Sequence, residues 1–167
     1  MIVIINIADL QKIREKNLGK KIIFCSGVFD LTHAGHALFF EDCKKLGDVL
    51  VVLTGNDESI KKYKGETRPI VNEHMRLKMI DSLKPVDYAL VSLAEYEKDD
   101  DPFAFIKVVI EKLRPDIYVV NNDAFDLAER ANLSKKYGTE LRVLKRWCPI
   151  EFENISTTAI IKKLQNS

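Results

Sequence analysis

Short apolar runs alternate along this chain with longer segments of helical spacing, and this alternation constrains the fold more than any other feature. The apolar runs predict strands at 21–26, 49–53, 88–91, 116–120 and 141–144. Apolar residues recur three and four positions apart, which predicts helices, at 34–46, 72–83, 103–113, 124–137 and 156–164. Continuous apolar strands need cover on both faces. The sequence therefore predicts a doubly wound α/β domain with a five-stranded parallel sheet.

Length and charge limit what else the chain can be. Its 167 residues suit one domain, and no linker or repeat divides them, so residues 1–167 are predicted to form a single domain. Lys and Arg number 26 and Asp and Glu number 25, which gives a formal net charge of +1. Duplex binding normally needs a clear basic excess, so we expect no nucleic-acid partner, whereas a small anion held by local charges fits this balance.

Targeting and redox features favour a cytoplasmic protein. No apolar run approaches the roughly 18 residues that a membrane helix needs, so we expect no membrane partner. The start of the chain, Met1–Ile5, is too short for a signal peptide and has no basic residue before its apolar part. The three cysteines, Cys25, Cys43 and Cys148, include no Cys-x-x-Cys and are typical of reduced thiols.

Two histidines directly after the first predicted strand are the main candidate site. His33 and His36 stand on either side of Gly35, where a helix is expected to begin. A helix N-terminus offers unpaired N–H groups and partial positive charge, which suit phosphate, and Gly35 lets a ligand approach the backbone. The ordinary alternative for a histidine pair is a surface or core role. Zinc fits poorly, because His74 is the only other histidine and no cysteine cluster completes a ligand set.

The residues around this pair resemble a known signature. Phe29-Asp30-x-x-His33-x-Gly35-His36 after a buried strand resembles the signature of the cytidylyltransferase-like nucleotidyltransferases. Further segments follow in the order of that family, namely Gly47-Asp48-Val49-Leu50-Val51-Val52, Lys64-Gly65-Glu66-Thr67-Arg68-Pro69, Arg76 and Ser156-Thr157-Thr158-x-Ile160. The resemblance covers about residues 20–164, which it implies to be the core of a single nucleotidyltransferase domain.

Within that superfamily, the segment 64–69 most resembles the adenylyltransferase domain of the ADP-heptose synthesis enzymes, the RfaE type. Those domains typically have a Lys-Gly-Gly-Asp-Tyr loop after the fourth strand, whereas this chain has Val120-Asn121-Asn122-Asp123-Ala124, so that only Asp123 matches. Glycerol-3-phosphate cytidylyltransferases place Arg-Thr-Glu-Gly before the final Ser-Thr-Thr. This chain has Glu151-Phe152-Glu153-Asn154 there, without arginine, which argues mildly against CTP.

The resemblance implies a nucleotidyltransferase that moves a nucleotidyl group from a nucleoside triphosphate to a phosphorylated small molecule and releases pyrophosphate. ATP and a sugar phosphate such as heptose 1-phosphate are favoured. One alternative is a CTP-dependent cytidylyltransferase for glycerol 3-phosphate or another alcohol phosphate or phosphonate. Another is a non-catalytic nucleotide-binding module. The resemblance also implies Mg²⁺ carried mainly by the nucleotide, since no carboxylate pair marks a metal site in the protein, and a homodimer.

The same resemblance assigns candidate site residues. The implied catalytic residues are His33, His36, Lys64 and Thr157. The implied nucleotide-binding residues are Gly27, Val28, Phe29, Asp30, Gly35, Arg68, Arg76, Asp123, Ser156 and Thr158.

Each polar residue in these sets also has an ordinary structural role to weigh. Lys64 fits a solvated loop, and Arg68 and Arg76 fit ion pairs with acidic residues. Ser156 fits a helix cap. Asp30 is better suited to orient the histidine loop than to act as a base.

Overall fold

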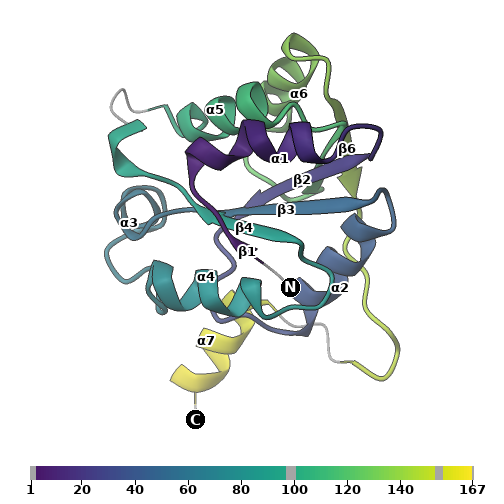
Figure 1. Cartoon of the computed structure of the whole chain (residues 1–167). Helices are drawn as coiled ribbons and strands as arrows, with labels where there is room; N and C mark the ends of the chain where they lie inside the picture. Colours follow the sequence, from purple (N-terminus) through teal and green to yellow (C-terminus); the bar gives the residue numbers. More distant parts are fainter. Residues whose placement is uncertain (1–2, 97–100, 153–155, 167) are drawn as a thin grey trace.

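All six strands of the sheet are parallel. The computed structural model describes residues 3–96, 101–152 and 156–166 (Figure 1). The strands are β1 (Val3–Ile4), β2 (Ile22–Gly27), β3 (Val49–Thr54), β4 (Tyr88–Val91), β5 (Ile117–Asn121) and β6 (Glu140–Leu144), in the spatial order β1-β4-β3-β2-β5-β6. The five predicted strands are therefore confirmed. The two-residue β1 adds a sixth at the edge beside β4, and it was too short to be read as a strand from its sequence.

Strand order places a crevice near the middle of the sheet. From β2 the chain moves through β3 to β4 on one side, and then returns to place β5 and β6 on the other side. The order reverses between β2 and β5, and ligands of open α/β sheets bind outside the carboxyl ends of the strands at such a point. The loop after β2, which carries the two histidines, and the loop after β5 therefore flank the expected ligand position.

Helices cover both faces of the sheet. One face carries α1 (Leu10–Lys16), α5 (Ala104–Leu113) and α6 (Leu127–Lys136), and the other carries α2 (Ala34–Lys44) and α4 (Glu73–Asp81) (Figure 1). The final helix α7 (Thr157–Gln165) lies on the α2 and α4 side, and short 3-10 turns occur at Ile7–Asp9 and Ala94–Tyr96. The five predicted helices are present, although α6 begins later than expected because Asp126 caps it by accepting from the Glu129 N–H.

Two helices were missed from the sequence, α1 and one that follows β3. Lys64, expected on a loop, is the last residue of α3 (Asp57–Lys64). Asn56 caps this helix by accepting from the Ser59 N–H at 2.8 Å, and two acidic residues in its first turn and three lysines at its end match the helix dipole. The segment is mostly polar and buries only Ile60, so it has no apolar periodicity that would predict a helix.

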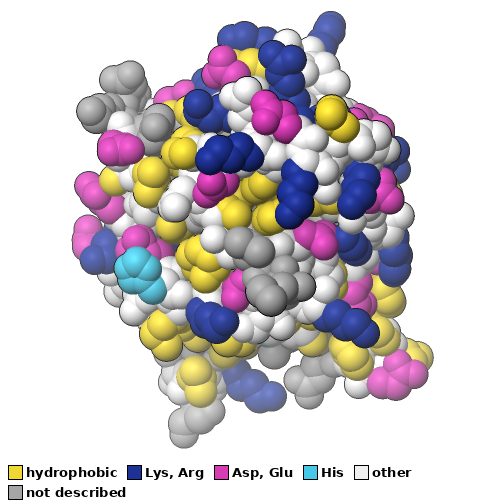
Figure 2. All heavy atoms as spheres, in the orientation of Figure 1, with side chains coloured by type: hydrophobic (Ala, Val, Ile, Leu, Met, Phe, Trp, Pro, Cys, Tyr) yellow, Lys and Arg dark blue, Asp and Glu magenta, His cyan; other side chains and the backbone are white. Residues whose placement is uncertain are grey.

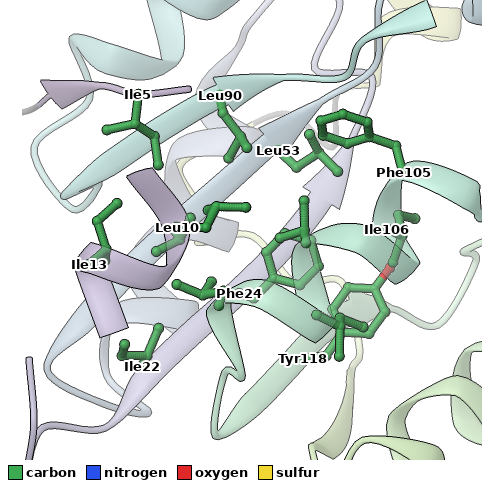
Figure 3. Packing of buried hydrophobic residues seen from close by; sticks show 14 of the residues in the cluster. Ile5, Leu10, Ile13, Ile22, Phe24, Leu53, Leu90, Phe105, Ile106 and Tyr118 are labelled. Atoms are coloured by element: carbon green, nitrogen blue, oxygen red, sulfur yellow. The ribbon is translucent and has the colours of Figure 1, made fainter. Parts of the chain in front are cut away.

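Alternate residues of the central strands build two separate cores. On β2, Ile22 and Phe24 face the α1 and α5 side, whereas Ile23 and Cys25 face the α2 and α4 side. Figure 3 shows Phe24 and Tyr118 among the residues of the first core, and their rings stack with centroids 5.0 Å apart. Two-sided burial of this kind explains why the strands lack polar alternation.

The segment before residue 20 contributes to the first hydrophobic core. Ile5, Leu10 and Ile13 are all buried in the first core, where they lie near Leu90 and Ile22 (Figure 3). Helix α1 packs against α5. The short apolar stripe of α1 was too brief to reveal this from periodicity alone.

Charged side chains of both signs are interspersed over the face shown in Figure 2. In the described part of the chain, no helix combines the length and the apolar character that crossing a bilayer requires.

The role of α1 can be tested by truncating its most buried residue. Leu10 is 0% exposed, so Leu10→Ala should lower the free energy of unfolding by about 2–5 kcal/mol through lost burial and a residual cavity. Denaturant titration measures this change. Leu18→Ala is the matched control, because Leu18 is 78% exposed and its truncation should change stability by less than about 0.5 kcal/mol. Equal effects from both variants would contradict the assignment of α1 to the core.

Candidate active site

The loop between β2 and α2 is fixed by the buried carboxylate of Asp30. Its oxygens accept hydrogen bonds from the N–H groups of Leu31, Ile70 and Val71 at 3.1, 2.9 and 3.0 Å, and the guanidinium of Arg68 pairs with it at 2.8 Å. Asp30 thus ties the segment 68–71 to the histidine loop. Arg68 and Asp30, both implied to bind nucleotide, have their charged groups directed at each other.

The backbone on both sides of Asp30 is left-handed. Phe29 and Leu31 have φ values of +51° and +46°, a region that residues other than glycine rarely adopt. Such strain persists where surrounding contacts hold it, and it often marks functional loops. Phe29 is buried. The centroid of its ring lies 4.9 Å from that of Phe40 and 5.4 Å from that of His36, to which it is edge-on. A Cβ on Gly27 would lie only 2.8 Å from the Phe29 ring, so this close packing requires glycine there.

The two histidines form the N-terminal cap of α2. Nδ1 of His33 accepts from the Gly35 N–H at 3.1 Å, and Nδ1 of His36 accepts from the His33 N–H at 3.4 Å. The two rings stack with centroids 4.0 Å apart. Since each Nδ1 acts as an acceptor, each neutral ring carries its proton on Nε2. Both histidines therefore offer an Nε2–H donor to a ligand at the helix N-terminus.

Both imidazoles are neutral at pH 7. Burial lowers the pKa of His36 to about 3, and the neighbouring His33 and Arg146 act in the same direction, against the opposing effect of Asp30. Burial and then Arg146 also lower the pKa of His33. The pair therefore acts through hydrogen-bond donation, and positive charge at the site must come from other residues.

The histidines border a small cavity of about 50 Å³ at the ends of β5 and β6. The other residues around it that matter for a ligand are Gly35, Asn121, Arg146, Trp147 and Phe152. Sequence reasoning missed Arg146, which brings a guanidinium to this cavity. Its only signal was its position just beyond the predicted last strand, at the edge where ligands bind. Asp123, implied to bind nucleotide, pairs with Arg146 at 2.9 Å on the rim.

A larger cavity lies on the other side of the same loop. Its volume is about 400 Å³, and Ser26, Gly27, Val28 and Lys64 contribute to its lining. Residues 26–28 thus border one cavity and residues 33–36 border the other. Two ligands could therefore meet across the β2–α2 loop.

The N-terminus of α7 docks onto this loop. The Thr157 hydroxyl donates to the backbone carbonyl of Asp30 at 2.8 Å, and Ser156 caps the helix by accepting from the Ala159 N–H at 3.2 Å. Thr158 is exposed. The starts of α2 and α7 therefore converge near Asp30. Residues 153–155, which include part of the segment where the glycerol-3-phosphate cytidylyltransferases have arginine, lie outside the described residues.

Arg76 does not join the site. It is 1% exposed, and each of its five N–H donors is directed at a protein acceptor. Nε donates to the carbonyl of Val71, the Nη1 group to Val28 and Thr54, and the Nη2 group to Gly55 and Asp57. This arrangement corrects the expected contact with phosphate, because no donor is left for a ligand. Arg76 instead positions the loops after β2 and β3.

Comparison with known proteins identifies the family. The family model for cytidylyltransferase-like proteins matches residues 24–163. The bifunctional protein HldE of Helicobacter pylori is 37% identical over 162 residues, which cover 96% of this chain and 31% of that protein. A lipopolysaccharide core biosynthesis protein from Thermoplasma volcanium has a crystal structure with a TM-score of 0.61 and 35% identity, covering 78% of this chain and 99% of that one.

The chain therefore belongs to the cytidylyltransferase-like family, as the histidine signature predicted. The HldE relatives also confirm the narrower resemblance to the RfaE type, and the chain spans about a third of their length. Pantoate-beta-alanine ligase from Francisella tularensis, at 16% identity and a TM-score of 0.65 over 99% of this chain and 77% of that one, shares the fold alone.

The structural role of Arg76 predicts a large stability effect. Arg76→Met leaves several buried acceptors and the Asp57 carboxylate without a partner, so it should cost about 3–5 kcal/mol of unfolding free energy. Arg76→Lys should recover little, because an ammonium cannot reproduce five donors in a planar fork. Denaturant titration without ligand measures both. The control is Lys78→Met on the same helix, where the side chain is 70% exposed. A cost for Arg76→Met as small as that control would contradict the role.

The neutral state of His36 predicts a pH effect on stability. An exposed histidine in the unfolded chain has a pKa near ~6.5, whereas His36 in the folded chain has a pKa of about 3. As the pH falls, the unfolded chain binds the proton first, so the free energy of unfolding falls below about pH 6.5. His36 should account for about 2 kcal/mol of the loss between pH 7 and pH 5.

The measurement compares denaturant titrations of wild type and His36→Asn at both pH values. The variant should lose less stability on acidification, and any constant effect of the smaller side chain cancels. His74→Asn changes an exposed histidine, so this variant should lose as much stability between pH 7 and pH 5 as wild type does. The same pH dependence in all three proteins would show that His36 is not buried in its neutral form.

Proposed function

We propose that this protein transfers an adenylyl group from ATP to a sugar phosphate such as heptose 1-phosphate and releases pyrophosphate. The observation that carries the proposal is the pair of neutral imidazoles at the start of α2, which face a cavity shared with Arg146. The similarity to HldE, over nearly the whole of this chain, supports the adenylyl donor and the sugar phosphate acceptor. It covers only about a third of those relatives, so the proposal concerns this one activity.

The proposed reaction is a direct displacement at phosphorus. An oxygen of the acceptor phosphate forms a bond to the α-phosphorus of ATP, and the bond from that phosphorus to the bridging oxygen breaks. The electron pair leaves with pyrophosphate, so no protein nucleophile is needed. Catalysis then rests on positioning and on stabilising charge in the transition state.

The residues of the first cavity supply that stabilisation. The Nε2–H groups of His33 and His36 donate to phosphate oxygens, and the N–H groups at the start of α2 add partial positive charge. Arg146, which pairs with Asp123, is a cation at the rim of this cavity. Lys64 lines the second cavity, where it can reach oxygens on the acceptor side of the reacting phosphorus. Because these donors are held in place by protein contacts, little reorganisation accompanies the reaction.

We also propose that Mg²⁺ enters with the nucleotide. In the ranges 3–96, 101–152 and 156–166, no group of three or more His, Cys, Asp or Glu side chains is arranged to hold a metal ion. The donors at the first cavity suit phosphate oxygens, so the ion would be coordinated mainly by the triphosphate, whose charge it offsets. The homodimer and the cytoplasmic location stay predictions.

The activity can be tested by measuring pyrophosphate release with Mg²⁺, heptose 1-phosphate and each of ATP, CTP, GTP and UTP. ATP should be the preferred donor. His36→Asn should lower kcat by roughly 10²–10³-fold, because it removes a donor to the charge that develops in the transition state. His74→Asn is the control and should retain wild-type rates. Release with CTP alone, or full activity of His36→Asn, would overturn the proposal.

A further inference from the structure

The larger cavity has the size and position of a second substrate site. At about 400 Å³ it falls within the range of roughly 300–1,000 Å³ that is typical of small-molecule sites. It lies at the carboxyl ends of β2 and β3, between α3 and the start of α5. Its lining includes residues 26–28, which lead directly into the loop that carries His33 and His36.

The wall of this cavity is mainly apolar and holds two cationic side chains. Leu53, Ile60, Phe103, Phe105 and Ile106 supply apolar and aromatic surface. Its serine hydroxyls already have protein partners, since Ser26 bonds to Tyr118, Ser59 to Asn56 and Ser92 to Asn56. The cations are Lys64 from α3 and Arg130 from α6. An anionic group is therefore the polar feature that a ligand of this cavity would need.

Arg130 is held in a fixed orientation. Its guanidinium carbon lies 5.0 Å from the centre of the Phe103 ring and 5.7 Å from that of Tyr118. Nε donates to the carbonyl of Phe125 at 2.7 Å, and the Nη1 group donates to the Tyr118 hydroxyl and lies 3.5 Å from the Ser26 hydroxyl. Stacked and hydrogen-bonded in this way, the guanidinium loses little freedom on binding a ligand.

The charge of Arg130 is not neutralised by the residues that the structure describes. None of the ion pairs among them involves Arg130, and none of their hydrogen bonds uses its Nη2 group. Its closest polar partner, Tyr118, is fully buried, and burial raises the pKa of that hydroxyl against the opposing effect of Arg130, so it stays neutral. A half-buried cation that none of the described carboxylates pairs with, on the wall of a cavity, is suited to donate its free Nη2 hydrogens to a phosphate.

We propose that Arg130 binds the phosphate group of the acceptor in this cavity, an inference that rests on the proposed function. Lys64 is the second cation, and the aromatic wall packs against the rest of the acceptor. Arg130 is then a specificity-determining residue for phosphate monoesters. Nothing in the histidine signature points to it, because it lies on a helix on the opposite side of β2 from α2.

The test separates acceptor binding from nucleotide binding. For Arg130→Met, we expect the KM for heptose 1-phosphate to rise about 10–100-fold, the size of a lost charge-assisted hydrogen bond. The KM for ATP should change by less than about threefold, which also shows that the fold is intact. Arg130→Lys should recover part of the acceptor affinity, because it keeps the charge without the fork. Arg142→Met, which removes an exposed guanidinium paired with Glu140, should behave as wild type.

Equal changes in both KM values, or no change in either, would overturn the inference. Calorimetric titration of heptose 1-phosphate and of inorganic phosphate, without nucleotide, keeps the result separate from the proposed activity. Suppose that wild type releases no pyrophosphate but binds either probe, and that Arg130→Met weakens this binding whereas Arg142→Met does not. The proposed activity is then wrong, and the proposed phosphate site is supported. If neither titration depends on Arg130, the phosphate site is wrong even in an active enzyme.

Discussion

The carboxylate of Asp30 is buried at the centre of the site and accepts hydrogen bonds from the loop that follows it and from the segment 68–71. A buried charge is tolerated only when such donors surround it. Its backbone carbonyl also receives the Thr157 hydroxyl at the start of α7. Three parts of the chain that are distant in sequence are thus joined at one residue. The left-handed backbone on either side, and with it the position of His33 and His36, depends on these contacts.

Around this fixed loop, the site separates hydrogen bonding from charge. Burial keeps both imidazoles neutral, so they serve as oriented Nε2–H donors. Positive charge stands at the rims, with Arg146 at the histidine cavity and Lys64 and Arg130 at the larger one. A cationic imidazole pair would lose the two Nδ1 contacts that cap α2, because a protonated ring has no acceptor. Neutral histidines therefore preserve the cap of α2, where we propose that phosphate binds.

Much of the fold could be predicted because burial on both faces leaves a clear record in the sequence. The continuous apolar runs of β2, β3 and β5 belong to strands whose alternate residues enter two cores. The same argument fails where burial is slight. Helix α3 buries only Ile60 and β1 has two residues, so neither has a periodicity that separates it from a loop. The histidine motif was found because its chemistry is local, with the two rings and the helix start within four residues.

Arginines show why the rest of the site could not be read from the chain alone. Arg76 and Arg130 both lie on helices, and both send a guanidinium toward the carboxyl ends of the strands. All five N–H donors of Arg76 have protein acceptors, so none is free for a ligand. The acceptors are Val71, Val28, Thr54, Gly55 and Asp57. Arg130 is held by aromatic rings and neutral oxygens, which fix its position, and no carboxylate of the described residues pairs with it. Which arginine is available to a ligand is therefore decided by acceptors from three separate segments in each case, and no local sequence pattern records that set.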